Sequence, residues 1–255
     1  IAAAIYAACK ATVKVGNGKE IVLHEETNYP FEEGIKFTVS TDEKVDFPFY
    51  LRIPSWTEGA EVRVNGKKIS VKPVSGKYLC IEREWADGDK VEMTLPMSLS
   101  MRTWQVNKNS VSVDYGPLTL SLKIAEKYVE KDSRETAIGD SKWQKGADSK
   151  KWPTTEIYPD SPWNYSLVLD KREPLKNFKV VRKSWPADNF PFTVANVPLE
   201  VKATGQMIPE WQIDETGLCG VLPEEDAVKG AKEEITLIPM GAARLRISAF
   251  PNTKE

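Results

Sequence analysis

The chain of 255 residues is 41% hydrophobic and 28% charged, which is enough apolar material for one large domain or two of ordinary size. Lysine and arginine total 35 against 37 aspartates and glutamates, so the formal net charge is −2 and no basic block argues for nucleic acid or an anionic membrane as a partner. No apolar run approaches the roughly 20 residues that a membrane-spanning helix needs.

The alanine-rich opening, residues 1–9, has no basic start and runs straight into strand-like sequence. We therefore expect no signal peptide there, and we interpret position 1 as a cut edge rather than a natural beginning.

The first half of the chain alternates apolar and polar residues with a period of two, which is typical of strands with one buried face. The pair Asn65-Gly66 lies between two such alternating runs and is the strongest short-range signal for a β-hairpin. Trp85-Ala-Asp-Gly-Asp89 predicts another turn. The predicted strands cover residues 11–15, 20–26, 34–39, 46–53, 77–82, 90–95, 98–104 and 110–122.

A bulge or bend is expected at Asp114-Tyr-Gly-Pro117, inside the last of these strands, because glycine and proline do not both fit a regular central ladder. Strands that recur every 8–12 residues or so, with turn signals between them and no helical period, predict an antiparallel sandwich.

The composition changes in the second half. Residues 126–151 are polar and charged, which predicts a long connection or an exposed excursion. A short helix is expected within Pro223–Gly230. Strand-like sequence returns at residues 165–169, 178–181, 192–194, 199–203, 234–238 and 243–250.

The predicted fold class is therefore all-β, with two consecutive antiparallel β-sandwich-like domains and little helix. We expect the first domain over residues 1–125 and a second, smaller one over residues 126–255, with a long aromatic-rich connection at about 126–165.

Few residues carry the chemistry that enzymes usually need. Cys9, Cys80 and Cys219 are far apart without metal-type spacing, and each is expected to pack as a small core hydrophobe. His24 is the single histidine and lies in an alternating strand, so a surface or partly packed imidazole is expected. No spacing suits zinc, and no glycine-rich loop precedes a helix, so neither a metal site nor a phosphate site is predicted.

Paired carboxylates are a separate possibility, because glycoside hydrolysis requires two that flank a bond. In a chain with 37 acidic residues, neighbouring pairs arise by chance and usually face solvent. We therefore predict no catalytic pair among the candidates, which are Glu25-Glu26, Glu32-Glu33 and Glu82 with Glu84.

Aromatic residues offer a better lead, because they crowd the proline-rich segment between Trp143 and Tyr165. Flat rings stack on the apolar faces of sugar rings, and Asp160 and Glu156 are available to bond hydroxyl groups. The alternative is that the rings pin a long loop to the sandwich. The predicted carbohydrate-binding residues are Trp152, Tyr158, Trp163, Asn164 and Tyr165.

Six motifs, in order, resemble the C-terminal part of the β-L-arabinofuranosidase-like proteins, glycoside hydrolase families 127 and 146 and their relatives, which are common in gut Bacteroidetes. The likeness runs over nearly the whole chain. The motifs are Leu51-Arg-Ile-Pro-Ser-Trp56, Val64-Asn-Gly66, Tyr78 through Asp89 with Val91-Glu-Met-Thr-Leu-Pro-Met97, Asp114-Tyr-Gly-Pro-Leu118, Ser161-Pro-Trp-Asn-Tyr165 and the tail Ile235–Pro251.

The resemblance implies that catalysis belongs to an N-terminal (α/α)6 barrel with a zinc-bound cysteine nucleophile and a glutamate acid/base. No residue of this chain matches those groups, so the catalytic and metal residues expected here are none, and the zinc cofactor is expected in the catalytic domain. The family also implies a periplasmic or extracellular location.

These expectations combine into one interpretation with alternatives. The chain is expected to be the non-catalytic C-terminal β-sandwich portion of a glycoside hydrolase of plant-glycan degradation, bracing the barrel and inactive alone. Its expected partners are that barrel, a glycan and a second copy of the chain. The first alternative is a carbohydrate-binding module that uses residues 152–165. The others are an adhesive sandwich unrelated to glycans and an enzyme active in this form.

Overall fold

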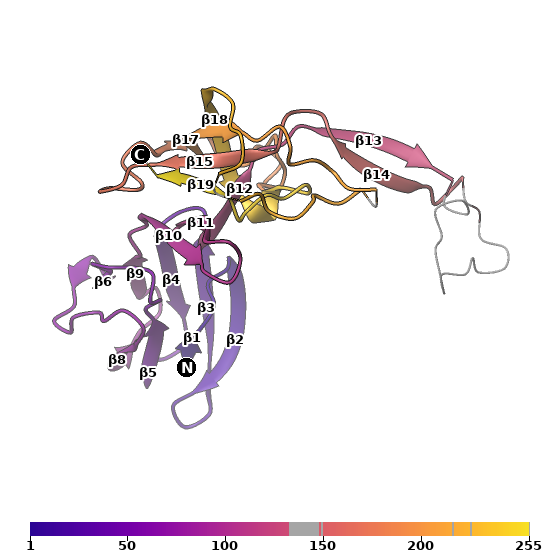
Figure 1. Ribbon diagram of the computed structural model, residues 1–255. Helices are drawn as coiled ribbons and strands as arrows, with labels where there is room; N and C mark the ends of the chain where they lie inside the picture. Colours follow the sequence, from indigo (N-terminus) through magenta and orange to yellow (C-terminus); the bar gives the residue numbers. More distant parts are fainter. Residues whose placement is uncertain (133–147, 149, 216, 225, 255) are drawn as a thin grey trace. The chain divides into compact units, whose positions relative to one another are not determined.

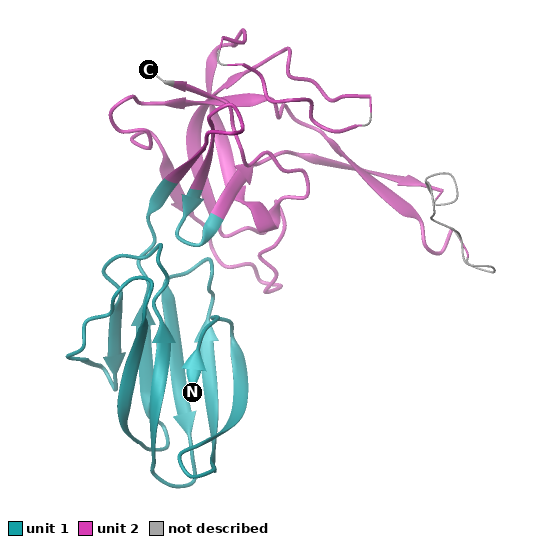
Figure 2. Ribbon diagram, turned by 60° about the horizontal axis from the view of Figure 1, so that its bottom comes forward, with its two compact units in different colours: residues 1–100, 114–118 teal, residues 101–113, 119–255 magenta. Residues whose placement is uncertain are grey.

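The computed structural model describes residues 1–132, 148, 150–215, 217–224 and 226–254. The chain divides into two compact units, one of residues 1–100 with 114–118 and the other of residues 101–113 with 119–255 (Figure 2). The domain boundary that the sequence places between residues 125 and 126 stays a prediction. Among the described residues, no helix is long and apolar enough to cross a membrane.

Unit 1 contains two sheets whose buried faces share one core, and this confirms the predicted sandwich architecture (Figure 1). The smaller sheet has the order β1 (Ala2–Ala3), β5 (Val45–Arg52), β8 (Tyr78–Trp85). The larger has the order β2 (Cys9–Val15), β3 (Lys19–Thr27), β4 (Gly34–Ser40), β9 (Lys90–Thr94), β6 (Glu61–Val64), β7 (Lys67–Lys68).

The alternation in sequence determines which residues fill this core. Along β5 every second side chain is buried, because successive residues of a strand point to opposite faces. At the centre of the core, Trp85 is fully buried, its ring stacks on Phe47, and its indole N–H donates to the Phe47 carbonyl oxygen at 2.9 Å. Phe49 completes the aromatic group with an edge-on contact to Trp85.

The predicted hairpin at Asn65-Gly66 is confirmed. Both residues have positive φ, 50° and 76°, as a type I′ turn requires. The Asp89 carboxylate lies beneath this turn, where it accepts a hydrogen bond from Asn65 Nδ2 at 2.7 Å and another from the Ala86 backbone N–H at 2.9 Å. The turn at residues 85–89 and the Asn65-Gly66 hairpin are therefore joined.

Most residues of the largest sheet belong to unit 2. Its order is β10 (Leu99–Trp104), β11 (Ser110–Tyr115), β12 (Leu118–Leu122), β18 (Lys232–Pro239), β17 (Leu199–Met207), β15 (Tyr165–Leu169), β19 (Asn252–Lys254), with β16 (Lys179–Arg182) paired to β17. β11 and β15 are buried along their whole length. In β15 the apolar run Leu167-Val-Leu169 therefore does not alternate, whereas β11 still alternates polar residues with valine and tyrosine. Most pairings of the fold are antiparallel, whereas β1 with β5 and β15 with β19 are parallel.

The bulge or bend expected at Asp114–Pro117 is a full reversal of the chain, so the single strand predicted over residues 110–122 is the hairpin β11–β12. Gly116 takes φ +55°, and a Cβ at this position would lie 2.7 Å from Cγ of Met97, so both the turn and the packing require glycine.

The polar segment that begins at residue 126 contains a strand that the sequence did not reveal. β13 (Glu126–Lys131) pairs with β14 (Thr154–Pro159), and the two form a hairpin that extends from the eight-stranded sheet of unit 2 (Figures 1 and 2). The first six residues of the predicted excursion thus form one strand of a two-stranded arm, whose second strand lies within the expected aromatic loop. Residues 133–147 and 149 of the excursion lie outside the described residues.

Three further local predictions are wrong among the described residues. Residues 192–194 form no strand, and residues 243–250 follow a short 3-10 helix, η1 (Met240–Ala242), with irregular backbone instead of a strand. In place of the helix expected within Pro223–Gly230, the Ala227 N–H donates to the Glu224 carbonyl in a turn.

Candidate functional site

The five predicted carbohydrate-binding residues lie in different surroundings. Trp152 precedes β14 and is 66% exposed, and Tyr158 on β14 is 45% exposed. The Tyr158 hydroxyl donates to the Glu156 carboxylate at 2.5 Å, a bond that raises the pKa of this phenol. Both rings are therefore accessible, on the arm of unit 2. Trp143, which belongs to the same aromatic segment, lies outside the described residues.

Trp163, Asn164 and Tyr165 connect the arm to β15. The half-buried Trp163 ring meets Trp211 edge to face, with centroids 5.1 Å apart. Asn164 is buried and donates through Nδ2 to the Ile208 carbonyl at 2.8 Å, while the Ile208 N–H donates back to the Asn164 carbonyl. Tyr165 is 6% exposed, and burial raises the pKa of its hydroxyl. The last two residues fix the chain where the arm joins the sheet.

Two of the predicted residues, Tyr158 and Trp163, line one cavity of about 410 Å³ within unit 2. Trp152, Asn164 and Tyr165 do not line it. Most of the cavity wall is aliphatic. The other residues that line it are Ile124, Ile157, Pro159, Ile213, Gly217, Leu218, Cys219, Arg244, Leu245, Arg246 and Ile247.

Most of the residues that sequence reasoning missed come from two segments distant in the chain, 213–219 and 244–247, and the others are Ile124, Ile157 and Pro159. The first is a loop closed by the isolated bridge between Ile213 and Cys219. The second follows η1 and was expected to be a strand, whose alternate side chains would have faced opposite sides. Residues 244–247 belong to the tail motif of the resemblance, but that motif gave no signal for Arg244 and Arg246 as cavity residues.

Charge at this cavity is mainly positive. Arg244 and Arg246 are exposed, and the Arg246 Nε–H donates to the Ala243 carbonyl at 2.8 Å. The carboxylate beside them is Glu126, whose Oε1 accepts from the Arg244 backbone N–H at 3.1 Å and whose Oε2 accepts from the Tyr128 hydroxyl at 2.5 Å. The hydrogen bond to Glu126 is the main reason that the pKa of Tyr128 is raised.

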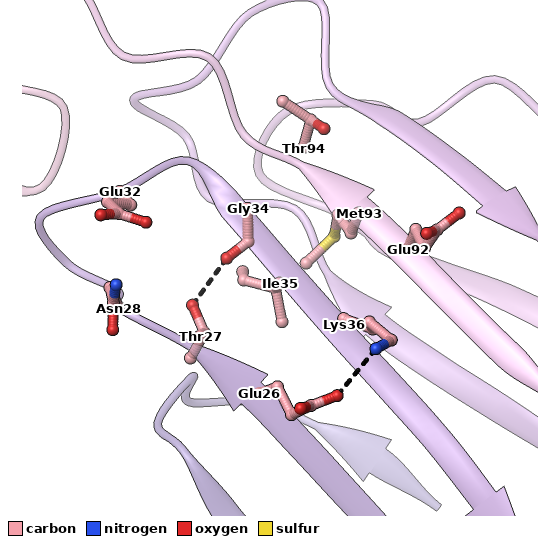
Figure 3. A pocket seen from close by; sticks show the side chains of 10 residues that line it. All are labelled: Glu26, Thr27, Asn28, Glu32, Gly34, Ile35, Lys36, Glu92, Met93 and Thr94. Atoms are coloured by element: carbon pink, nitrogen blue, oxygen red, sulfur yellow. Dashed lines mark hydrogen bonds and ion pairs between the residues drawn. The ribbon is translucent and has the colours of Figure 1, made fainter.

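A second depression, also of about 410 Å³, lies on the larger sheet of unit 1 (Figure 3). Its carboxylates are Glu26, Glu32 and Glu92. Figure 3 shows the Lys36 side chain, on β4, joined to Glu26, and this ion pair measures 2.9 Å. This ion pair lowers the pKa of Glu26. A catalytic acid needs a raised pKa, so the arrangement does not suit Glu26 for proton donation.

The neighbouring Glu25 has the opposite character. It is 6% exposed, and burial raises the pKa of its carboxyl to about 7. The Ala7 N–H donates to Oε1 at 3.0 Å, and the Cys9 thiol, opposite Glu25 on β2, lies 3.8 Å from Oε2. Glu25 and Glu26 therefore point to opposite faces of β3, one toward the core and one toward solvent.

The cysteines do not lie where the sequence predicted. Cys9 and Cys219 are exposed and Cys80 is partly buried, so the expectation of core packing is wrong for the first two, which lie at a strand end and in a loop. Within the described part of the chain, no three His, Cys, Asp or Glu side chains form a group that would hold a metal ion. These residues do not fit the zinc–thiolate centre that the resemblance implies for the catalytic domain.

Comparison with known proteins gives one family match. Residues 1–97 match the model of the β-L-arabinofuranosidase GH127 middle domain. No curated protein matches the chain.

Solved structures give a likeness over the whole chain. A GH127 β-L-arabinofuranosidase from Geobacillus stearothermophilus T6 is 19% identical with a TM-score of 0.61, and the match covers 99% of this chain and 33% of the enzyme. A protein described as a GH127 β-arabinofuranosidase is 22% identical with the same TM-score, with 99% of this chain and 34% of that protein covered. The chain thus spans about one third of their length and shares the fold of that third, and the resemblance drawn from the sequence motifs is confirmed.

Proposed function

We propose, from the match of residues 1–97 to the model of the GH127 middle domain, that this chain is the non-catalytic β portion of a β-L-arabinofuranosidase-like glycoside hydrolase. In this role its two units brace an (α/α)6 catalytic barrel. The whole protein acts on plant glycans outside the cytoplasm, and the zinc ion belongs to the barrel.

The main support for the proposal is that nearly the whole chain is similar in structure to part of a GH127 enzyme. Almost all of this chain superimposes on one third of a GH127 enzyme. A sheet sandwich of this kind supplies a large rigid surface to a neighbouring domain.

The described residues show a raised carboxyl pKa at Glu25, but its neighbours are a backbone N–H and one thiol, not a second carboxylate across a cleft.

The bracing role is tested by the coding sequence that precedes Ile1. We expect it to encode an (α/α)6 barrel with a Cys-Cys pair near its end. The barrel produced together with this chain should then unfold at a higher temperature than the barrel alone. An unrelated domain upstream, or a barrel of unchanged stability, would contradict the proposal.

A second candidate function is carbohydrate binding by unit 2, and a specific observation favours it. The structure brings Tyr158 and Trp163 to one cavity although they lie on different segments of the aromatic stretch. Aromatic faces are the usual contact for the apolar side of a sugar ring.

Replacing Trp163 with alanine is expected to weaken glycan binding by about tenfold if the cavity is a sugar site, because a stacked ring contributes roughly 0.5–1.5 kcal/mol beyond its buried area. The measurement is retardation in gels that contain plant arabinan, with Trp152→Ala as the matched control because Trp152 lies outside the cavity. Equal retardation of both variants and the parent chain would exclude the cavity as the sugar site, and no retardation at all would favour bracing alone.

A further inference from the structure

The cavity of unit 2 has the size of a small-molecule site and an unusually apolar wall. Its volume of about 410 Å³ lies within the range of roughly 300–1,000 Å³ that is typical of ligand pockets. The aliphatic side chains of Ile157, Leu218 and Leu245 line it beside the Trp163 ring. Leu218 is 66% exposed and Ile213 is 42% exposed, so part of this apolar surface is in contact with water.

Two guanidinium groups give the cavity its charge. Arg244 and Arg246 both line it, and neither forms an ion pair with a carboxylate of the described residues. The Glu126 carboxylate lies beside Arg244, and both of its oxygens accept hydrogen bonds already, one from the Arg244 backbone and one from Tyr128. The Arg244 side chain also has a hydrogen bond with the Tyr128 hydroxyl, whereas the side-chain N–H donors of Arg246 other than Nε remain for a ligand.

This combination selects a ligand class. A guanidinium group bonds a carboxylate through two parallel N–H donors, which a neutral ligand does not reproduce. The aliphatic wall has few polar side chains for the hydroxyl groups of a bare sugar, whereas a flat aromatic ring buries apolar area against Trp163 and Leu218.

We propose that the cavity bounded by Trp163, Leu218, Arg244 and Arg246 binds a small aromatic carboxylate. The ring of the ligand lies against the aliphatic and indole wall, and its carboxylate meets the two arginines. This goes beyond the bracing role and does not depend on it. The cavity is the one considered above as a candidate sugar site, and the ligand proposed for it here is an aromatic carboxylate instead of a sugar.

The test is calorimetric titration of the full chain with cinnamate, with cinnamyl alcohol, which has the same ring without the charge, and with galacturonate and L-arabinose as sugars. Cinnamate should bind saturably and at least about tenfold more tightly than each of the other three. Arg244→Gln and Arg246→Gln should each weaken cinnamate about tenfold and leave cinnamyl alcohol unchanged. Arg172→Gln is the matched control, an exposed arginine of unit 2 outside the cavity.

Cys219 supplies an independent readout, because it is exposed and lines the cavity. Bound cinnamate should slow its alkylation by iodoacetamide and leave the alkylation of Cys9, which is exposed in unit 1, unchanged. The proposal is overturned if cinnamate shows no saturable binding at about 10 mM, if the alcohol binds equally well, or if both arginine variants bind as the parent does. Tighter binding of either sugar than of cinnamate also overturns the proposal and supports the sugar site. If none of the four ligands binds, both the aromatic-carboxylate site and the sugar site are excluded.

Discussion

Replacing Trp85 with alanine is expected to lower the free energy of unfolding of unit 1 by about 3–5 kcal/mol. The indole is fully buried and packs on Phe47 and Phe49, so its removal leaves a cavity between the two sheets. The Phe47 carbonyl also loses its indole donor. Trp85→Phe keeps much of the ring volume and removes the donor, so its expected loss is smaller, about 1–2 kcal/mol.

Urea unfolding followed by hydrogen exchange of the β5 and β8 amides measures this effect in unit 1 of the intact chain. Trp152→Ala is the matched control, because that ring is 66% exposed and belongs to unit 2, and it should change the stability of unit 1 by less than about 0.5 kcal/mol. A loss below about 1 kcal/mol for Trp85→Ala would contradict the placement of the indole in the core.

Replacing Glu25 with glutamine is expected to change the dependence of unit 1 stability on pH. Burial raises the pKa of the folded carboxyl from 4.5 to about 7. Below pH 4.5 the Glu25 carboxyl is protonated in both the folded and the unfolded chain. Between pH 4.5 and 7 the unfolded chain loses this proton while the folded chain keeps it, so rising pH destabilises the fold. Above pH 7 both are ionised and the loss is complete, at about 3 kcal/mol for this shift.

Glutamine has no proton to lose, and its side-chain oxygen still accepts from the Ala7 N–H. The stability of Glu25→Gln relative to the parent chain should therefore rise by about 3 kcal/mol between pH 4.5 and pH 8. Glu26→Gln is the control: the Lys36 ion pair lowers the pKa of Glu26, so its contribution is lost on acidification, and the relative stability should shift in the opposite direction. A pH-independent difference for Glu25→Gln would show that the carboxyl is not buried.

Local signals in the sequence were sufficient for much of unit 1. The Asn65-Gly66 turn was predictable because positive φ at two successive residues is tolerated by few residue types. The β5 strand was predictable because one buried face imposes a period of two. The sequence named Glu25-Glu26 only as a neighbouring acidic pair, and the burial of Glu25 was not predictable because it depends on the residues that the fold brings over it.

The features of unit 2 that sequence reasoning missed depend on long-range pairing. β13 pairs with β14 across more than twenty residues, and its six residues, Glu126–Lys131, contain too few apolar side chains to indicate a strand. The aromatic segment was identified, but not the separation of its rings: Tyr158 and Trp163 line the cavity, whereas Tyr165 is buried on β15. The cavity itself joins four separate parts of the chain, Ile124 and residues 157–163, 213–219 and 244–247, and no spacing in the sequence predicts such a junction.

The two proposals place different demands on the chain. Bracing requires rigid sheets, which the shared core of unit 1 and the eight-stranded sheet supply. Ligand binding requires an accessible cavity, and the one beside Trp163 lies wholly within unit 2. A chain of this kind can therefore support a catalytic domain and carry a binding site of its own.

The most direct test of the non-catalytic role is the turnover of 4-nitrophenyl β-L-arabinofuranoside by the purified chain, with and without added zinc. We predict a rate equal to that of buffer in both cases. Turnover above buffer that is lost in Glu25→Gln or Cys9→Ser would contradict the account, because it would place the reacting groups in the sheets of unit 1.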